Sequence, residues 1–276
     1  MLIYSEPVFR PPAEAGSLII QLTEGCPWNR CLFCPMYKGK EFKMKGAAEL
    51  ADHLGQLAAA YGQAYRRAFL ADGDSLALSA EELEAAMISA RHFFPGLNRF
   101  GIYGSVFSLA AKSVSDLERL RRQGLRFVYL GLESGSEAVL TRVDKYMPAD
   151  EMIDNCRRVT AAGLSLSLMV IVGLGGLDMS AVHARETAAV VSAIAPPHTS
   201  LLNLMLEHTS LKKDPNHRSF NLSDYCREVW AFLKALECRT IFRANHASNP
   251  LALEGVMPRD RERLLAQLLR IMPDML

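Results

Sequence analysis

The sequence predicts an α/β protein built around a mostly parallel β-sheet. Short apolar runs of strand length alternate with longer runs whose apolar residues recur at helical spacing. The short runs are apolar on both faces, which is typical of parallel strands that helices cover on both sides. A helix after most strands implies parallel pairing through right-handed crossovers. The pattern fits both a doubly wound sheet and a partial barrel, and in either one ligands collect at the carboxyl ends of the strands.

The predicted elements follow one another regularly over residues 17–206. Strands are predicted at residues 17–22, 67–71, 99–103, 127–132, 166–172 and 200–206. Helices are predicted at residues 47–61, 80–94, 115–123, 137–143, 149–162 and 180–194. After the second strand, the turn sequence Asp-Gly-Asp-Ser at residues 72–75 also offers an N-cap for the next helix.

The last seventy residues have a different character. They begin with a polar loop, and the predicted elements after it are a helix, a short strand and a terminal helix, at residues 224–236, 239–242 and 257–271. We expect this part to cap the sheet rather than to fold independently. The expected organisation is an N-terminal extension at residues 1–16, a core at 17–206 and a C-terminal extension at 207–276.

Composition excludes several classes of protein. Of the 276 residues, 50% are hydrophobic and 22% are charged, which excludes a disordered or fibrous chain. The formal charge of +1 and the lack of a basic, aromatic-rich patch disfavour a nucleic-acid partner and a tRNA-modifying activity. No apolar run reaches the roughly 18 residues that span a bilayer, and residues 1–15 do not resemble a signal peptide. We therefore expect a cytoplasmic protein that acts on a small molecule, away from membranes.

Three of the six cysteines lie within nine residues, directly after the first predicted strand: Cys26, Cys31 and Cys34. Thiolates are the preferred ligands of iron–sulfur clusters and of zinc. Structural zinc normally has four protein ligands, so a fourth would have to come from a distant Cys or His. A cubane cluster held by three thiolates leaves one iron open to a small ligand, and this interpretation is favoured. A zinc-stabilised binding module and a barrel enzyme with incidental buried cysteines remain the alternatives.

This segment resembles the cluster loop of the radical S-adenosylmethionine (SAM) superfamily. The commonest spacing there is C-x3-C-x2-C with an aromatic residue before the third cysteine; this chain has C-x4-C-x2-C and Phe33 in that place. The resemblance implies a partial (β/α)6 TIM-like barrel with a C-terminal capping extension. It also implies that Cys26, Cys31 and Cys34 hold a 4Fe–4S cluster whose open iron binds the amino and carboxylate groups of SAM.

Further segments resemble the family's SAM contacts, in the expected order. Residues 72–74 are similar to the stretch that meets the methionine amino group, although the usual Gly-Gly-Glu is Asp-Gly-Asp here. Residues 131–136 resemble the segment at the ribose and methionine, and residues 172–176 the stretch under the adenine. Lys145, with Arg142 as a rival, occupies the place of a basic residue that faces the carboxylate. The candidate cofactor-binding residues are Phe33, Asp72, Gly73, Asp74, Ser105, Glu133, Ser134, Lys145, Val172 and Gly173.

Each of these segments also has an ordinary structural explanation. Gly and Asp commonly form turns and helix caps at strand ends, and Lys145 alone would be a solvated surface lysine. The joint order of the segments after successive strands is what favours a cofactor site.

The resemblance also implies a reaction. One electron from a flavodoxin, a ferredoxin or a similar donor reduces the cluster, and SAM is cleaved to methionine and a 5′-deoxyadenosyl radical, which abstracts hydrogen from an unactivated carbon. The enzyme would be an oxidoreductase, a transferase or a lyase. The other cysteines, Cys156, Cys226 and Cys238, are too dispersed to hold a second cluster. We also expect no cobalamin-binding region ahead of the barrel, and hence no cobalamin-dependent methylation.

Candidate substrate residues lie near the C-terminus. Residues 243–250 gather several hydrogen-bonding side chains before a proline, and such a loop would orient a polar substrate. His246 is an acid–base candidate there, with Asn245 and Asn249 beside it. Asn203 and Glu207, at the expected end of the sixth strand, are candidates for the same cavity. An ordinary surface turn is the alternative for this loop.

Overall fold

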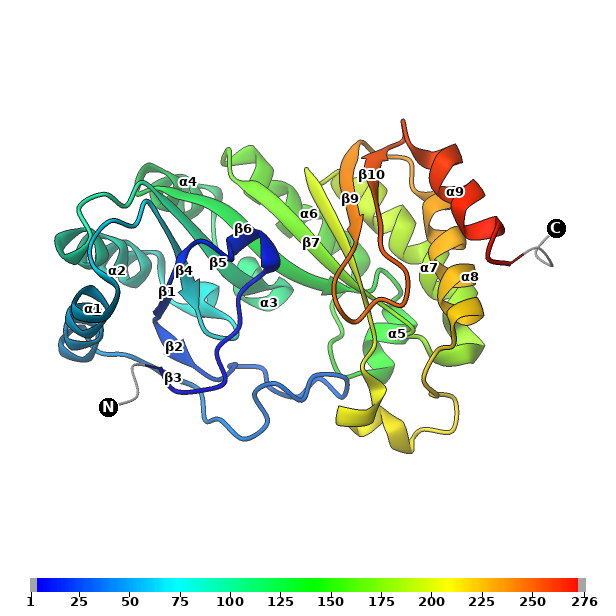
Figure 1. Ribbon diagram of the computed structural model, residues 1–276, viewed down its shortest axis with the longest axis horizontal. Coiled ribbons are helices and arrows are strands. Elements are labelled where there is room, and N and C mark those ends of the chain that lie inside the picture. Colours follow the sequence, from blue (N-terminus) through cyan, green and yellow to red (C-terminus); the bar gives the residue numbers. More distant parts are fainter. Residues whose placement is uncertain (1–3, 273–276) are drawn as a thin grey trace. The chain divides into compact units, whose positions relative to one another are not determined.

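The structure, a computed structural model, describes residues 4–272 and confirms the α/β class with a mostly parallel sheet. The main sheet has eight strands in the order β1-β4-β5-β6-β7-β8-β9-β10 (Figure 1). The described chain divides into two compact units: residues 4–29, 36–130 and 155–166 form the first, and residues 30–35, 131–154 and 167–272 the second. The predicted division at residues 16 and 206 stays a prediction, and its ends at residues 1–3 and 273–276 lie outside the described residues.

The first unit contains the beginning of the parallel sheet. Strand β4 pairs in parallel with β1 on one side and with β5 on the other. The strands here are β1 (Leu18–Gln21), β4 (Arg67–Ala71), β5 (Arg99–Ser105), most of β6 (Leu125–Glu133) and the small antiparallel pair β2 (Thr23–Glu24) and β3 (Lys43–Met44). The helices are α1 (Ala47–Tyr61), α2 (Ala80–Phe93), α3 (Val106–Ala110), α4 (Val114–Arg122) and the second part of α6 (Ala149–Ala161).

One predicted cap in this unit is wrong. Residues 72–75 lead into the short 3₁₀ turn Ser75–Ala77, and α2 begins only at Ala80. Ser79 is the N-cap, because its hydroxyl accepts from the Glu82 N–H at 3.2 Å while the Glu82 carboxylate accepts from the Ser79 N–H at 2.7 Å. This reciprocal capping box satisfies two N–H groups at the start of the helix, so it determines where the helix begins. Residues 72–74 are thereby left outside the helix.

The second unit continues the sheet beyond the six predicted strands. β7 pairs with β8 and β8 with β9 in parallel, and β10 closes the edge antiparallel to β9. The strands are β7 (Ser165–Val172), β8 (His198–Asn203), β9 (Thr240–Ala244) and β10 (Leu253–Met257). The helices are α5 (Glu137–Arg142), the start of α6, α7 (Gly176–Ile194), α8 (Leu222–Ala235) and α9 (Arg261–Leu269).

Among the boundaries in this unit that differ from the prediction, the end of β8 and the start of α9 bear on the candidate residues. Strand β8 ends at Asn203, and the 3₁₀ turn Leu206–His208 follows it, so the prediction that Glu207 ends the strand is wrong. The terminal helix begins at Arg261 rather than at residue 257, because residues 253–257 pair with β9 as a strand. At β8 the apolar residues 204–206 were assigned to the strand, since so short a run carries little period of its own.

The described residues were also searched for membrane spans. Across residues 4–272, no helix is both long enough and apolar enough to cross a bilayer.

Candidate cofactor site

The cysteine segment follows β1 and β2. Cys26 belongs to the first unit, whereas Cys31 and Cys34 belong to the second. All three are half-buried thiols, and across residues 4–272 no cysteine forms a disulfide. Over the same residues no three Cys, His, Asp or Glu side chains already form a group that would hold a metal ion. The joint role of the three thiols therefore stays a prediction.

The part of the loop in the second unit is fixed to its surroundings by backbone and side chain. The N–H of Leu32 donates to the carbonyl of Val143 at 3.0 Å, and the carbonyl of Leu32 accepts from Ser210 N–H at 3.0 Å. Phe33 is buried in an apolar cluster, against which Cys31 and Cys34 also pack. The other buried members of this cluster are Val139, Val143, Leu174, Leu206 and Leu211. The aromatic residue before the third cysteine thus anchors the loop.

A buried ion pair lies at the end of β6. The ammonium of Lys145 lies 2.8 Å from Oε1 of Glu133 and donates to the carbonyl of Gly131 at 2.9 Å. The two side chains are only 7% and 12% exposed, so the alternative interpretation of Lys145 as a solvated surface lysine is wrong. Gly131 makes the pair possible, because a Cβ there would lie 2.1 Å from the Glu133 carboxylate. The ammonium also lies 5.8 Å from the centre of the Phe33 ring, within the range of a cation–π contact.

The backbone of Glu133 is itself unusual. Its φ is +65°, in the left-handed region that non-glycine residues seldom adopt, and Ser134 N–H donates to the Leu132 carbonyl at 2.8 Å. Such a conformation costs about 1–3 kcal/mol and persists only where its surroundings hold it. The ion pair with Lys145 supplies such a hold. Backbone strain concentrates at functional sites, which agrees with the predicted role of residues 131–136.

In the first unit, Asp72 is fully buried. Its N–H donates to the Thr23 hydroxyl at 3.2 Å, and its Oδ2 lies 3.2 Å from the ammonium of Lys40. Burial raises the pKa of Asp72, against the opposing influence of the Tyr37 hydroxyl and of Lys40. At Gly73 a Cβ would lie 2.6 Å from the Gly25 carbonyl and 2.8 Å from the Tyr37 ring, so only glycine fits. Asp72 and Gly73 therefore hold the segment in place.

Asp74 and Ser105 are brought together at the ends of β4 and β5. The Ser105 hydroxyl donates to Asp74 Oδ2 at 2.6 Å, and the Ser105 N–H lies 3.3 Å from Oδ1. Both residues are candidate cofactor contacts from the sequence, and the structure brings their side chains within hydrogen-bonding distance of each other. Ser105 is also the N-cap of α3, since its hydroxyl accepts from Ser108 N–H at 3.1 Å.

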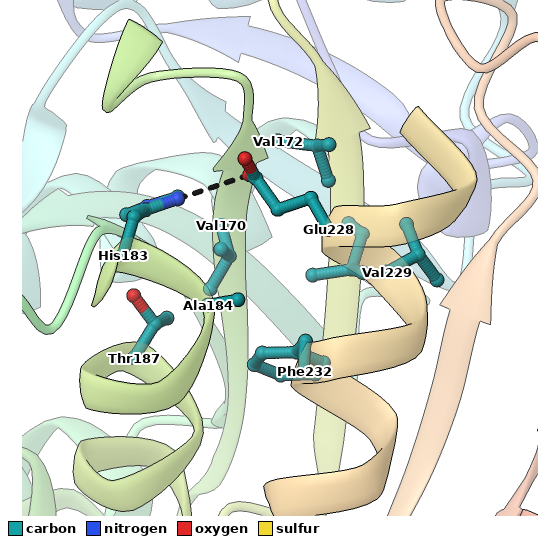
Figure 2. Close-up of a pocket in the computed structure, with 9 residues that line it drawn as sticks. Val170, Val172, His183, Ala184, Thr187, Glu228, Val229 and Phe232 are labelled. Atoms are coloured by element: carbon teal, nitrogen blue, oxygen red, sulfur yellow. Dashed lines mark hydrogen bonds and ion pairs between the residues drawn. The ribbon is translucent and has the colours of Figure 1, made fainter. Parts of the chain in front are cut away.

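The glycine segment after β7 is held by a glutamate that sequence reasoning missed. Gly173, with φ of +84°, donates its N–H to Glu228 Oε1 at 2.8 Å. The same carboxylate accepts from the Ser180 hydroxyl at 2.5 Å and lies 3.0 Å from His183 Nδ1. Figure 2 shows His183 of α7 and Glu228 of α8 pointing toward each other beside Val170 and Val172 of β7. His183 and Glu228 are 1% and 3% exposed, so these two members of the network lie inside the unit, whereas Ser180 is half-buried.

The cavity around this network is small. Its volume of about 10 Å³ admits about one water molecule, so it is not a ligand site. The signal that would have found Glu228 is its place on α8, because a lone acidic residue shares a face with buried apolar side chains. These are Tyr225, Cys226, Val229, Phe232 and Leu233. A charge on an apolar helix face requires partners.

Arg142 is engaged by its own unit. Its guanidinium binds both carboxylate oxygens of Asp178, at 2.9 and 2.8 Å, and donates to the Gly175 carbonyl at 3.1 Å. It therefore fastens the glycine segment to the first turn of α7. This bidentate contact disfavours Arg142 as the residue that meets the SAM carboxylate.

The loop after β9 is fixed to the end of β8. Asn249 donates its amide to the Leu201 carbonyl at 2.8 Å, and the Ser248 hydroxyl accepts from Asn203 N–H at 3.1 Å. His246 Nδ1 lies 2.8 Å from the same hydroxyl, and burial lowers the pKa of His246 below its usual value. Asn203 does end β8, as predicted. The structure thus gathers His246 and Asn249 at this strand end.

Two other substrate-side candidates lie apart from His246 and Asn249. Asn245 is exposed and donates to Glu254 at 3.4 Å, and Glu207 is exposed in its 3₁₀ turn.

Packing accounts for Trp28 and for the three scattered cysteines. Trp28 stacks on Phe107 with 4.2 Å between the ring centres. The scattered cysteines are buried, and burial raises the pKa of each thiol, to about 12 for Cys156. Raised pKa values keep them protonated, so they act as packing residues.

Comparison with known proteins gives one family and a set of similar folds. The family model of the radical SAM superfamily matches residues 20–187. No curated protein sequence matches the chain. Methylornithine synthase (PylB) is 15% identical with a TM-score of 0.54, over 93% of this chain and 81% of that one. Coproporphyrinogen III oxidase (HemN) from Escherichia coli, described as a radical SAM enzyme, is 14% identical with a TM-score of 0.55, over 93% and 52%.

The radical SAM methyltransferase TsrM from Kitasatospora setae, with cobalamin and a [4Fe–4S] cluster bound, is also similar. It is 18% identical with a TM-score of 0.53, over 68% of this chain and 36% of that one. The chain spans 36% of the length of TsrM and 27% of the length of OxsB, a cobalamin-dependent SAM radical enzyme that it also matches. At these identities the likeness establishes the fold, which is the partial TIM-like radical SAM fold expected from the sequence.

Proposed function

Because this chain belongs to the radical SAM superfamily, we propose that it cleaves SAM reductively and uses the resulting radical to take hydrogen from a small molecule. The observation that carries the proposal is the extent of the family match. Residues 20–187 include the three clustered cysteines and every predicted SAM-contact segment. The substrate and the class of the net reaction, whether oxidoreductase, transferase or lyase, are not assigned by this match.

We propose that Cys26, Cys31 and Cys34 hold a 4Fe–4S cluster. The donor set fits, because all three are half-buried thiols outside any disulfide, and three thiolates are the ligands that leave one iron open. Cys31 and Cys34 pack against the buried Phe33 cluster, which supports their positions in the loop. When bound, the cluster supplies the electron that cleaves SAM to methionine and a 5′-deoxyadenosyl radical.

The chain's own residues would bind and orient SAM. Glu133 presents a carboxylate at the end of β6, held by Lys145, and it is the candidate for hydrogen bonds to the ribose hydroxyls. Asp74, oriented by Ser105, is the candidate for the amino group. Gly173, fixed through Glu228, offers a stretch without side chain against which the adenine would lie. Phe33, Asp72, Gly73, Ser134 and Val172 complete the proposed set as supports of these contacts.

The remaining partners are also proposals. An electron donor such as flavodoxin or ferredoxin would reduce the cluster, in the cytoplasm. His246, Asn249, Asn245 and Glu207 are the proposed substrate-side residues. The lowered pKa of His246 keeps its imidazole neutral near pH 7, and a neutral imidazole accepts a proton.

Iron content tests the cluster. Protein purified and reconstituted without oxygen should be brown, contain about four irons per chain and bleach with dithionite. Cys26→Ala, Cys31→Ala and Cys34→Ala should each lose the iron, whereas the matched control Cys156→Ala should keep it, because Cys156 is a core residue. Colourless, zinc-loaded protein, or full iron retention in the three loop variants, would overturn the proposal.

A further inference from the structure

In the second unit, most of one face of strands β7–β10 is buried, and most side chains on the other face are half-buried or exposed. In β9, Thr240, Phe242 and Ala244 are buried, and the Phe242 ring lies 6.5 Å from that of Phe232 on α8. Helices therefore cover this face, as Figure 2 also shows for Val170 and Val172. Alternation along a strand places the residues between them on the opposite face. These are half-buried or exposed: Met169, Ile171, His198, Ser200, Leu202, Ile241, Arg243, Glu254 and Val256.

Strand register places one arginine in the middle of this open face. Met169 is in register with Ser200, Ser200 with Arg243, and Arg243 with Glu254, which makes one row across four strands. Within residues 4–272, the Arg243 side chain makes no hydrogen bond and no ion pair, although it is exposed in a strand rather than at a loop tip. Its neighbour Glu254 accepts from the Asn245 amide instead.

In the first unit, by contrast, the side chains on the sheet contact one another. The rings of Phe69, Tyr103 and Tyr129 meet edge to face, with 4.8 and 5.9 Å between the centre of Phe69 and the other two. The arginine among them, Arg99, lies 2.5 Å from the buried carboxylate of Glu14, which also accepts from the Tyr129 hydroxyl at 2.7 Å. That arginine is neutralised by the chain itself. Arg243 lies between Ser200 and Glu254 in its row and forms no ion pair with that glutamate, and a guanidinium without an ion-pair partner is complementary to an external anion.

We propose that the open face of β7–β10 binds the substrate and that Arg243, with Ser200 beside it, binds a carboxylate of that substrate. The planar guanidinium matches a carboxylate bidentately, and the Ser200 hydroxyl is a further donor in the same row. Met169, Ile171 and Leu202, in register around them, contact an adjoining apolar part of the molecule. This inference rests on the proposed function only in taking the bound acid to be the substrate.

The test uses 4-methylpentanoate and its neutral amide, which differ only in the carboxylate. Their dissociation constants are measured by ligand-observed NMR on the reconstituted full chain, whose iron content is determined separately. The wild type should bind the acid about tenfold more tightly than the amide, the change expected for one charge-assisted contact. Arg243→Gln should abolish that preference, and Arg243→Lys should restore part of it. Arg239→Gln, an exposed arginine just before β9, should leave it unchanged.

The binding data test the carboxylate site, and the iron content and SAM cleavage test the proposed function. If the wild type fails to bind the acid or does not distinguish it from the amide, or if Arg243→Gln keeps the preference, the carboxylate site is refuted. If the preference follows Arg243 in a protein that holds no iron and cleaves no SAM, the proposed function fails while the carboxylate site stands.

Discussion

Replacing Glu228 tests whether the glycine segment after β7 is held by one buried carboxylate. Glu228→Leu keeps an apolar side chain of similar length on α8 but removes the acceptor for Gly173, Ser180 and His183. Each donor left unpaired in the interior costs about 1–3 kcal/mol. Because the Ser180 hydroxyl can turn toward another acceptor, two donors are left unpaired, and we expect a total loss of about 3–5 kcal/mol.

That loss has a measurable size. Unfolding entropy scales with chain length, so about 1 kcal/mol corresponds to about 2 °C in a chain of this size, and Glu228→Leu should lower Tm by about 6–10 °C. Glu228→Gln keeps one carbonyl oxygen and the shape, and should lose only about 1–2 kcal/mol.

The assay is thermal unfolding followed by circular dichroism, with SAM affinity measured below the transition. Glu237→Gln is the matched control, because Glu237 is exposed. It should melt with the wild type. A Tm for Glu228→Leu within about 1 °C of the wild type would refute the reasoning, since about 0.5 kcal/mol is the size of an ordinary surface substitution. Weakened SAM binding by the folded variant would further support the role of Gly173.

Three further predictions concern the ends of β6 and β9. Gly131→Ala should destabilise the protein by about 1–3 kcal/mol, because the added Cβ displaces the Glu133 carboxylate. Gly39→Ala is the control and should leave the stability unchanged, because the space around Gly39 is open. Chemical denaturation measures the free energy of unfolding of both variants. Lys145→Met should weaken SAM binding in isothermal titration, since the Glu133 carboxylate loses its partner, and unchanged affinity would exclude the pair from the site. The pKa of His246, measured by NMR, should lie below 6.5, because burial disfavours the imidazolium cation. The free energy of unfolding should therefore decrease as the pH falls below the pKa that His246 has in the unfolded chain.

The regular elements were readable from the sequence because their patterns are complete within a single segment. The helix Ala47–Tyr61 and the strand Arg67–Ala71 were predicted at their observed bounds, since each has a clear period and a flanking breaker. β10 was missed because residues 253–257 include a glutamate and a glycine, and their strand form depends on pairing with β9. Pairing partners far along the chain leave no local signal.

The same distinction applies to the candidate site. Gly131 and Gly73 were singled out as parts of motifs, and the structure adds the reason, which is the close approach of other atoms. Burial of Lys145 could not be predicted, because a single lysine after a helix has no period that indicates where its ammonium lies. Glu228 is distant in sequence from the glycine segment that it holds, and only the packing of α8 against α7 connects them.

The most direct test of a SAM-cleaving enzyme is product formation by the reconstituted protein. Under dithionite and without oxygen, SAM should give 5′-deoxyadenosine and methionine in equal amounts, and the Cys31→Ala variant should give neither above background. Iron-replete protein that forms no 5′-deoxyadenosine, or a Cys31→Ala variant that forms as much as the wild type, would contradict the account.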